Sequence, residues 1–314
     1  MKKLEKDGEQ WYNFGEKGND REKGVSMYRL IAIDLDGTLL NSYGEISQKN
    51  KEAIQYAKQK GAEIVLCSGR VNSVGTLAEE IQADRYIICG NGSLLYDLKE
   101  NKILYSKEID KAKLMQILSI CEENSIFYNV YTEDTILTKS LNYNVLFYNQ
   151  ENLKKPEEKK TNIQIIPDLY HSIEKNEKDH FLKVTICDDN EIIFGSIIRK
   201  LRNIKNVDTL DVEHMSRKMF KSGTEEVKLE YYYTEITSQN VNKWNALSFL
   251  MEELGIKPEE VLAIGDNIND ESMLKNAGMG IAMGNSAPYI QEFANAVVAD
   301  NNSDGVAEAI YQYL

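Results

Sequence analysis

The sequence predicts an α/β protein: a doubly wound, Rossmann-like parallel sheet interrupted by an inserted second α/β domain. Near both ends of the chain, short and continuously apolar runs alternate with amphipathic helical patterns. Such runs suit strands that helices cover on both faces, because a strand with one wet face would alternate apolar and polar residues. The middle of the chain is more polar, and 314 residues are enough for two domains.

The first strands of the predicted sheet lie in the N-terminal part of the chain. The apolar run 30–33 predicts the first strand, and the helical pattern after it has Ser47 as its expected N-cap and Gly61 just past its end. Two further apolar runs, at 62–67 and 86–89, predict the next strands. Strands that alternate with helices imply right-handed crossovers and a doubly wound sheet.

The C-terminal third repeats this alternation in shorter units. A helix is predicted over 242–255, where Gly255 ends it, and the apolar run 261–264 predicts the strand that follows. The remaining units are a helix at 270–278, a strand at 280–283, a helix at 288–294, a strand at 296–299 and a helix at 304–314. We therefore expect both ends of the chain to build one core.

Residues 1–26 form a polar, charged segment without apolar periodicity. We interpret them as an N-terminal extension outside the fold, either a flexible tail or an upstream start. The alternative is that its aromatic residues, Trp11, Tyr12 and Phe14, pack against the body of the protein.

The middle of the chain predicts a separate module. Residues 106–234 are rich in Lys, Glu, Asn and Tyr, and their helical and strand patterns are less apolar than those at the two ends. We interpret this stretch as an inserted α/β cap domain. It would interrupt a core made of residues 28–105 and 235–314.

Charge and cysteine usage exclude several classes of protein. With 37 Lys+Arg against 50 Asp+Glu, the net charge of −13 argues against a broad nucleic-acid surface but not against a small anionic ligand. No apolar run approaches the roughly 18 residues of a membrane span, and the N-terminus lacks the apolar stretch of a signal peptide. The four cysteines are far apart, which favours a reducing cytosol. We expect a cytoplasmic monomer or homodimer without nucleic-acid or membrane partners.

Polar residues and glycine follow four of the predicted strands. Parallel strands end at the same edge of a sheet, and ligands bind beyond that edge. Carboxylates gathered there create a negative potential that a cation would relieve, and an oxygen-ligand site of this kind suits Mg²⁺. The four groups are Asp34 with Asp36, Ser68-Gly69-Arg70, Asn91 with Gly92, and Asp266 with Asn269 and Asp270.

Each group alone also has an ordinary structural explanation. Asp34 and Asp36 are compatible with turn chemistry, residues 68–70 with a helix cap, and residues 265–270 with an Asx turn. Lys243 alone, on an amphipathic helix, would most often be a solvated surface charge. Their conjunction in this order along the chain is what indicates a catalytic site.

Together these motifs resemble the haloacid dehalogenase superfamily of phosphatases. The motifs are D-x-D-G-T at 34–38, S-G-R at 68–70, Lys243 and G-D-N-I-N-D at 265–270. The tail, with GIAMGN at 280–285 and N-S-D-G-V at 302–306, looks like the Cof-type branch of sugar-phosphate phosphatases. That branch carries a large α/β cap between its second and third motifs. The resemblance therefore implies a core-and-cap phosphatase.

The resemblance implies a role for each aspartate of the first motif. Asp34 would be the nucleophile that forms an aspartyl-phosphate, as carboxylates do in this chemistry. Asp36 would protonate the leaving oxygen and then deprotonate the attacking water. Dehalogenases and transport ATPases of the superfamily lack a carboxylate at this second position, so a phosphatase or a mutase fits better.

The other motifs would bind the metal and the phosphoryl group. The resemblance implies Mg²⁺ with three ligands, Asp34, Asp36 through its backbone carbonyl, and Asp266, and two supporting residues, Asp270 and Thr38. The phosphoryl group would be bound by Ser68, Gly69, Arg70, Lys243 and Asn269, with Arg70 reaching either the phosphate or the cap. Lys243 would stabilise the charge on the transferring group.

One position departs from the pattern of the branch. Trp244 follows Lys243 where the branch usually has glycine, and it would either restrict the substrate or cover the end of the helix. Most aromatic residues of the insert are expected to form its own core, with one or two facing the site. These residues are Tyr128, Tyr131, Tyr143, Phe147, Tyr148 and Tyr231 to Tyr233.

We therefore predict a Mg²⁺-dependent phosphatase of small phosphorylated metabolites, with sugar phosphates as the leading class. Two alternatives stay open within enzymes: a dedicated phosphatase of a cofactor, such as pyridoxal phosphate or flavin mononucleotide, and a phosphomutase. A third alternative is a binding or regulatory protein that kept the fold and lost catalysis. The complete set of motif residues argues against the last of these.

Overall fold

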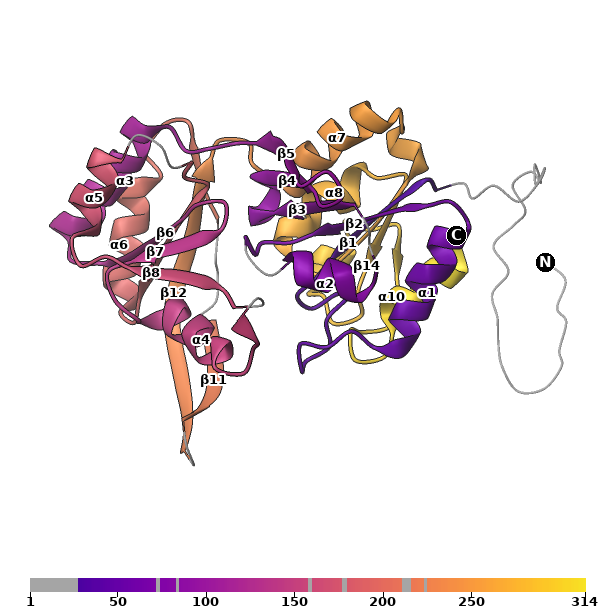
Figure 1. Ribbon diagram of the computed structural model, residues 1–314, viewed down its shortest axis with the longest axis horizontal. Coiled ribbons are helices and arrows are strands. Elements are labelled where there is room, and N and C mark those ends of the chain that lie inside the picture. Colours follow the sequence, from indigo (N-terminus) through magenta and orange to yellow (C-terminus); the bar gives the residue numbers. More distant parts are fainter. Residues whose placement is uncertain are drawn as a thin grey trace, which may run out of the picture.

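The computed structural model describes residues 28–71, 74–82, 85–157, 160–176, 180–210, 216–222 and 225–314. The predicted extension at 1–26, with its aromatic residues, lies outside the described residues. The described chain forms two bodies that lie side by side, each built around a β-sheet (Figure 1).

The first sheet, which we call the core sheet, has eight strands in the order β15-β14-β13-β1-β2-β3-β4-β5. Six neighbouring strands are parallel: β1 (Leu30–Asp34), β2 (Glu63–Cys67), β3 (Tyr86–Cys89), β13 (Val261–Gly265), β14 (Met279–Ala282) and β15 (Ala296–Val297). Their positions agree with the apolar runs of the sequence. The edge strands β4 (Leu94–Asp97) and β5 (Lys102–Ser106) are antiparallel and were not predicted. β5 is largely half-buried, so it lacks a continuous apolar run.

Helices cover both faces of the core sheet. On one face, Ile31 and Ile33 pack against α1 (Gln48–Gln59) and α10 (Gly305–Tyr313). On the other face, Leu30 and Ala32 pack against α7 (Lys243–Leu254) and α8 (Glu271–Asn276). Alternate residues of one strand are thus buried on opposite faces, which is why β1 is continuously apolar. Each fully buried Leu or Ile contributes about 1.5–3 kcal/mol.

Shorter elements complete the core. The helices α2 (Val74–Glu80) and α9 (Pro288–Gln291) follow β2 and β14 along the chain. Three 3₁₀ turns, η1 (Gly90–Gly92), η3 (Pro258–Glu260) and η4 (Ile268–Asp270), lie next to strand ends. Two of these turns, η1 and η4, follow the carboxyl ends of β3 and β13, so they lie at the edge where ligands bind in such sheets.

The second sheet, which we call the cap sheet, has the order β10-β12-β9-β6-β7-β8, with β11 paired to β12. All of its pairings are antiparallel except that of β7 with β8. The strands are β6 (Phe127–Tyr131), β7 (Thr135–Thr138), β8 (Asn162–Ile165), β9 (Lys183–Asp188), β10 (Val207–Thr209), β11 (Ser216–Ser222) and β12 (Glu225–Ser238). β12 is the longest strand, and with β11 it forms a hairpin that projects from the sheet (Figure 1).

The two faces of the cap sheet have different neighbours. Three helices, α3 (Lys111–Glu123), α5 (Leu169–Lys175) and α6 (Glu191–Leu201), build an apolar cluster on one face. On the other side, Val145 of α4 (Tyr143–Asn152) and Leu182 belong to the same buried cluster as residues of the core. The second face is therefore the one directed at the core sheet.

Two predicted absences can be compared with the described residues. The four cysteines are buried free thiols. Among the residues that the structure describes, no helix has the length and apolar character that a bilayer span requires.

Candidate active site

The first residues of the site come from the loop that follows β1. Asp34 ends the strand, and its side chain is buried. The chain then turns at Gly37, whose φ of +86° favours glycine. A Cβ there would lie 2.3 Å from Asp266 Oδ2, so glycine lets this loop pack directly against the loop after β13. The Thr38 hydroxyl fixes that contact by donating to Asp266 Oδ1 at 3.1 Å.

Lys243 begins α7 and extends into the same site. The helix start is fixed by Gly92 at the end of η1: its φ is +103°, and a Cβ there would lie 2.1 Å from the carbonyl oxygen of Asn242. This close approach holds the N-terminus of α7 beside the end of β3. The Lys243 side chain is fully buried, and its ammonium group donates to Asp34 Oδ1 and, at 2.5 Å, to Asp270 Oδ1.

Asp270 joins Lys243 to the loop after β13. It ends η4, and its Oδ2 accepts hydrogen bonds from the backbone N–H groups of Asp266 at 2.9 Å and Asn267 at 3.1 Å. Its Oδ1 is bound by Lys243. Because both of its oxygens are engaged and the residue is fully buried, Asp270 holds the loop and Lys243 in position.

Three carboxylates and one ammonium group share this buried site. Burial raises the pKa of Asp34 well above its usual value, Asp270 raises it further, and Lys243 opposes the shift. Burial also raises the pKa of Asp266 to about 7, with a contribution from Asp270. Burial disfavours the charge of Lys243, but Asp270 and Asp34 outweigh it and raise the pKa of the ammonium group. With all three carboxylates ionised, two negative charges therefore remain uncompensated.

This donor set fits a divalent cation. One carboxylate oxygen from each of Asp34, Asp266 and Asp270 lies within 4.8 Å of the others. In proteins Mg²⁺ is normally held by one or two carboxylates, while waters and a substrate phosphate fill the other positions. Since Asp270 is engaged elsewhere, Asp34 and Asp266 are the two carboxylates available to such an ion.

The carboxylate of Asp36 pairs with Arg70 rather than with Lys243. The Arg70 guanidinium donates to both carboxylate oxygens of Asp36. Nε donates to Oδ2 at 2.8 Å, and Nη2 donates to Oδ1. The Arg70 backbone N–H donates to Ser68 Oγ at 3.1 Å, which leaves the hydroxyl proton of Ser68 free to donate to a ligand. The carboxylate of Asp36 is thus not a member of the metal-binding group.

A chain of hydrogen bonds links the site to the cap sheet. Asn269 donates to Asn91 Oδ1 at 3.0 Å, and Asn91 donates to Glu235 Oε2 at 2.9 Å. The other oxygen of Glu235 pairs with Lys183 at 2.8 Å, and Lys183 also donates to the Gly69 carbonyl at 3.0 Å. The Lys183–Glu235 ion pair of the cap therefore contacts the core at two points.

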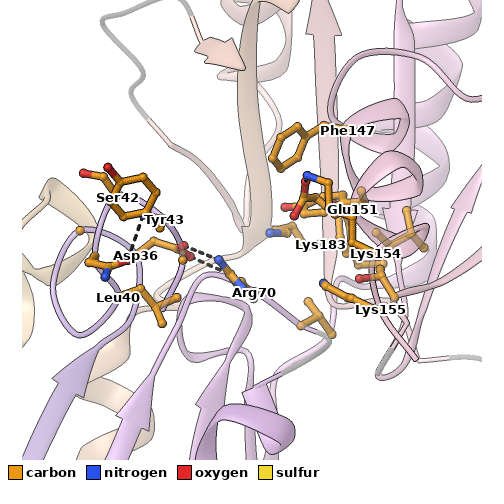
Figure 2. A pocket seen from close by; sticks show the side chains of 18 residues that line it. Asp36, Leu40, Ser42, Tyr43, Arg70, Phe147, Glu151, Lys154, Lys155 and Lys183 are labelled. Atoms are coloured by element: carbon orange, nitrogen blue, oxygen red, sulfur yellow. Dashed lines mark hydrogen bonds and ion pairs between the residues drawn. The ribbon is translucent and has the colours of Figure 1, made fainter. Parts of the chain in front are cut away.

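Two cavities lie between the core and cap sheets. The wider one is lined by Asp34, Asp36, Asn269 and the Lys183–Glu235 pair. A smaller cavity of about 370 Å³ lies beside it, between the loop after β1 and α4 (Figure 2). The cavities adjoin each other, because they share six lining residues: Asp36, Arg70, Tyr131, Phe147, Tyr148 and Lys183.

More aromatic residues line these cavities than the one or two expected. Tyr131, Phe147 and Tyr148 line both cavities, and Tyr231 and Tyr233 line the wider one. The other three lie elsewhere. Tyr128 belongs to the cluster beneath α3, Tyr143 packs between the rings of Phe127 and Tyr231, and Tyr232 stacks on Phe194 with a ring distance of 5.9 Å. Strand alternation explains the separation of Tyr232 from its two neighbours.

Trp244 lines neither cavity. It packs, partly buried, against the cluster formed by α7 and the core sheet, together with Leu104, Tyr105 and Phe249. Its position therefore gives no support for a direct restriction of the substrate by Trp244.

The comparison with known proteins decides the family. The family model for haloacid dehalogenase-like hydrolases matches residues 31–310, almost the whole described chain. This chain is a haloacid dehalogenase-like hydrolase. The predicted membership of this superfamily, in its Cof-type phosphatase branch, is therefore confirmed.

Relatives of this hydrolase include named phosphatases. It is 30% identical to phosphatase YwpJ of Bacillus subtilis, over 91% of this chain and 100% of the relative. It is 25% identical to pyridoxal phosphate phosphatase YbhA of Escherichia coli, over 91% of this chain and 98% of the relative. These relatives support the predicted enzyme class, a phosphatase.

A solved structure supports the fold. A haloacid dehalogenase-like hydrolase from B. subtilis matches with a TM-score of 0.74 and 28% identity, over 91% of this chain and 100% of that chain. The predicted fold class, a doubly wound parallel-sheet core with an inserted α/β cap, is therefore confirmed.

For this hydrolase, the structure gathers most of the predicted site residues. Asp34, Lys243, Asp266 and Asp270 converge with Thr38 at the edge of the core sheet. Gly69, Arg70 and Asn269 line the wider cavity, and Ser68 is buried beside Gly69. The catalytic roles of all these residues remain predictions.

Four residues near the site were not among the predicted site residues. Asn91 was noted at a strand end, and this position is the signal that identifies it. Asn285 lies in the GIAMGN motif and donates to the Gly37 carbonyl at 2.9 Å. Lys183 and Glu235 are 52 positions apart in a polar insert, and no sequence pattern connects them.

Proposed function

We propose that this hydrolase cleaves small phosphate monoesters, with sugar phosphates as the leading class, through an aspartyl-phosphate on Asp34. One observation carries the proposal: Asp34 lies at a strand end in contact with a fully buried lysine, beside a second available carboxylate. An isolated buried cluster with this charge would be unfavourable unless a ligand or ion compensated it.

We further propose that residues 28–105 and the chain after β12 form the catalytic core, and that the residues between them form the cap. The boundary predicted between residues 234 and 235 falls inside β12 (Glu225–Ser238), a strand of the cap sheet, so Glu235 lies on the cap side of the site. Substrate would bind between core and cap, with its phosphate over Asp34 and its leaving group toward α4 and the cap sheet. Ser68, through its hydroxyl, and Gly69, through its amide, would donate to the phosphoryl oxygens. Mg²⁺, held by Asp34, Asp266 and the Asp36 carbonyl, would neutralise charge on the phosphoryl oxygens.

In the first step, a carboxylate oxygen of Asp34 attacks phosphorus and the ester P–O bond breaks. Lys243 stays protonated and holds Asp34 in position for the attack, and its positive charge would stabilise negative charge on the transferring phosphoryl oxygens. Asp36 gives a proton to the departing oxygen, so the leaving group departs as a neutral alcohol.

In the second step, Asp36 takes a proton from water and that water attacks phosphorus. The bond between phosphorus and Asp34 breaks, which restores the carboxylate and releases inorganic phosphate. Asp270 takes no proton in either step, because its two oxygens hold Lys243 and the backbone of the loop.

This mechanism requires Arg70 to release Asp36. Both oxygens of Asp36 accept hydrogen bonds from Arg70, so neither is positioned to give a proton to a substrate. An anionic substrate entering the cavity would compete for the guanidinium. We infer that substrate binding moves Arg70 from Asp36 to the substrate, which frees Asp36 to act.

A second candidate is a dedicated cofactor phosphatase that acts on pyridoxal phosphate. Two observations favour keeping it: the aromatic residues Tyr131, Phe147 and Tyr148 line the cavities, and one relative is named for this activity. Flat rings stack well against such side chains.

The decisive test is release of phosphate from p-nitrophenyl phosphate with added Mg²⁺, compared with the same assay in EDTA. We expect the wild type to be active only with the metal and Asp34→Asn to lose about 10³-fold or more, since removing a covalent nucleophile removes the reaction path. Undiminished turnover by Asp34→Asn would refute the mechanism. A panel of sugar phosphates and pyridoxal phosphate would then separate the two substrate classes.

A further inference from the structure

The smaller cavity is built from two parts of the chain. The loop after β1 and Arg70 form one wall, and α4 with the segment after it forms the other (Figure 2). It adjoins the wider cavity at the Asp36–Arg70 pair, which lines both cavities and which the proposed mechanism separates when substrate binds. A leaving group attached to a phosphate over Asp34 would therefore extend into this cavity.

The cavity is rich in positive charge, and most of that charge is paired. Arg70 binds Asp36, Lys154 pairs with Glu151 at 2.8 Å, and Lys183 pairs with Glu235 at 2.8 Å. These are the carboxylates that contact the cations around the cavity. The fourth cation that lines the cavity is Lys155.

Lys155 has no side-chain hydrogen bond or ion pair within the part of the chain that the structure describes. Its side chain is half-buried and extends from the cap wall toward Arg70 (Figure 2). Burial lowers the pKa of Lys155, and the nearby positive charge of Arg70 lowers it further, while Glu151 acts in the opposite direction. A half-buried ammonium group without a close counter-ion is an anion-binding group.

The backbone holds Lys155 in this place. Asn152, the last residue of α4, accepts from the Thr161 N–H at 2.8 Å and donates to the Thr161 carbonyl at 2.8 Å. The Lys155 N–H donates to the carbonyl of Asn152 at 3.2 Å. The start of the segment that carries Lys155 is therefore tied to the end of α4 and to the beginning of β8.

We propose that Lys155 forms a subsite for a second anionic group on the substrate, a carboxylate or a second phosphate at the far end of the leaving group. The proposal rests on the proposed phosphatase function. Arg70 lies between the two anion sites, so once it leaves Asp36 it would contact the same substrate. Phe147 and Tyr148 line the wall between, where they suit the carbon skeleton of the leaving group.

The test compares substrates that differ mainly in the second anion. Glucose 6-phosphate and 6-phosphogluconate differ by a carboxylate, and fructose 6-phosphate and fructose 1,6-bisphosphate differ by a phosphate. In the wild type we expect the kcat/KM for at least one substrate with a second anionic group to exceed that of its partner by about tenfold or more. The pair that shows the preference identifies which anion the subsite takes.

The variant Lys155→Met should lower this preference by about ten- to a hundredfold, the range of a charge-assisted hydrogen bond. Lys154→Met is the matched control, because Lys154 is its neighbour, is more exposed and is already paired; its preference should stay within about twofold of the wild type. Lys155→Arg should restore the preference. An unchanged preference in Lys155→Met, or an equal loss on both substrates of a pair, would overturn the proposal.

Binding to Asp34→Asn separates this proposal from the proposed function. Calorimetry with 6-phosphogluconate and fructose 1,6-bisphosphate on Asp34→Asn, with and without Lys155→Met, measures the subsite without turnover. Affinity that depends on Lys155 while the wild type releases no phosphate would support the subsite and refute the phosphatase. Turnover without any dependence on Lys155 would refute the subsite and leave the phosphatase.

Discussion

The core buries a lysine against Asp34 of the wider cavity, and the cap places a lysine in the wall of the smaller cavity; the two lysines differ in burial and in ion pairing. Lys243 of the core is fully buried and contacts two carboxylates. Lys155 of the cap is half-buried, and no carboxylate of the described chain binds it. The core therefore compensates its own cation and needs only a divalent metal to balance the site. The cap does not compensate Lys155. In the proposed subsite, the second anionic group of the substrate would compensate it, so this lysine would contribute to substrate selection.

The largest effect is expected at Lys243. Lys243→Met removes the ammonium group between Asp34 and Asp270 and leaves two buried carboxylates unpaired. We expect the free energy of unfolding to fall by about 3–5 kcal/mol and kcat to fall by roughly 10²–10³-fold. Urea denaturation and a phosphate-release assay measure the two effects. Wild-type stability in this variant would show that the ion pairs of Lys243 with Asp34 and Asp270 do not stabilise the fold.

Glycine substitutions compare the core and the cap directly. Gly92→Ala places a Cβ 2.1 Å from the carbonyl oxygen of Asn242, at a φ of +103°. We expect the free energy of unfolding to fall by about 2 kcal/mol or more. Activity should fall as well, because the start of α7 and with it Lys243 would be displaced. Gly195→Ala in α6 meets open space and should stabilise by about 0.5–1 kcal/mol. Thermal unfolding of both variants checks this. Equal effects at the two positions would contradict the comparison.

The metal site of the core should be sensitive to pH. Burial raises the pKa of Asp266 to about 7, so in the metal-free protein this carboxyl stabilises the fold below its ordinary pKa and loses that contribution as pH rises through about 7. Metal binding requires the ionised form. We expect the affinity for Mg²⁺ to be about tenfold weaker at pH 6 than at pH 8. The rise in Tm on adding Mg²⁺ should therefore be smaller at pH 6. Equal rises in Tm at the two pH values would disprove competition between protons and Mg²⁺ for the Asp266 carboxylate. Asp266→Asn, which cannot ionise at this position, is the control.

The smallest effect is expected at the cap wall. Phe147→Ala removes a ring that lines both cavities, so kcat/KM should fall by roughly three- to tenfold for a sugar phosphate. Methyl phosphate has no leaving group long enough to reach α4, so its kcat/KM should change less than twofold. Steady-state kinetics with the two substrates gives the comparison. An equal loss of kcat/KM on both substrates would mean that Phe147 affects the catalytic residues of the core and does not contact the leaving group.

The same contrast explains how much of the molecule the sequence could predict. The core strands were found because burial on both faces requires uninterrupted apolar runs, and Asp34 and Asp266 followed because their strands end at one edge. The cap sheet is mixed and partly exposed, so its residues carry no comparable pattern.

Pairings between side chains were harder to predict than positions. The ion pair of Asp36 with Arg70 joins two motifs that were both recognised, yet which partner a flexible side chain selects depends on the cavity around it. Lys155 belongs to the polar run K-K-P-E-E-K-K at 154–160, which has the composition of a solvated surface. Only the fold shows that Lys154 and Lys155 line a cavity and that Lys154 is paired there with Glu151.

The contacts of Lys183 and Glu235 with the core have a consequence for the timing of each catalytic cycle. Lys183 holds the Gly69 carbonyl, Glu235 holds Asn91, and the two side chains also hold each other. They stand on neighbouring strands of one sheet, so a movement of that sheet away from the core would break both links. If the proposed cap has to open to release product, this ion pair would then contribute to the barrier of opening as well as to the shape of the site.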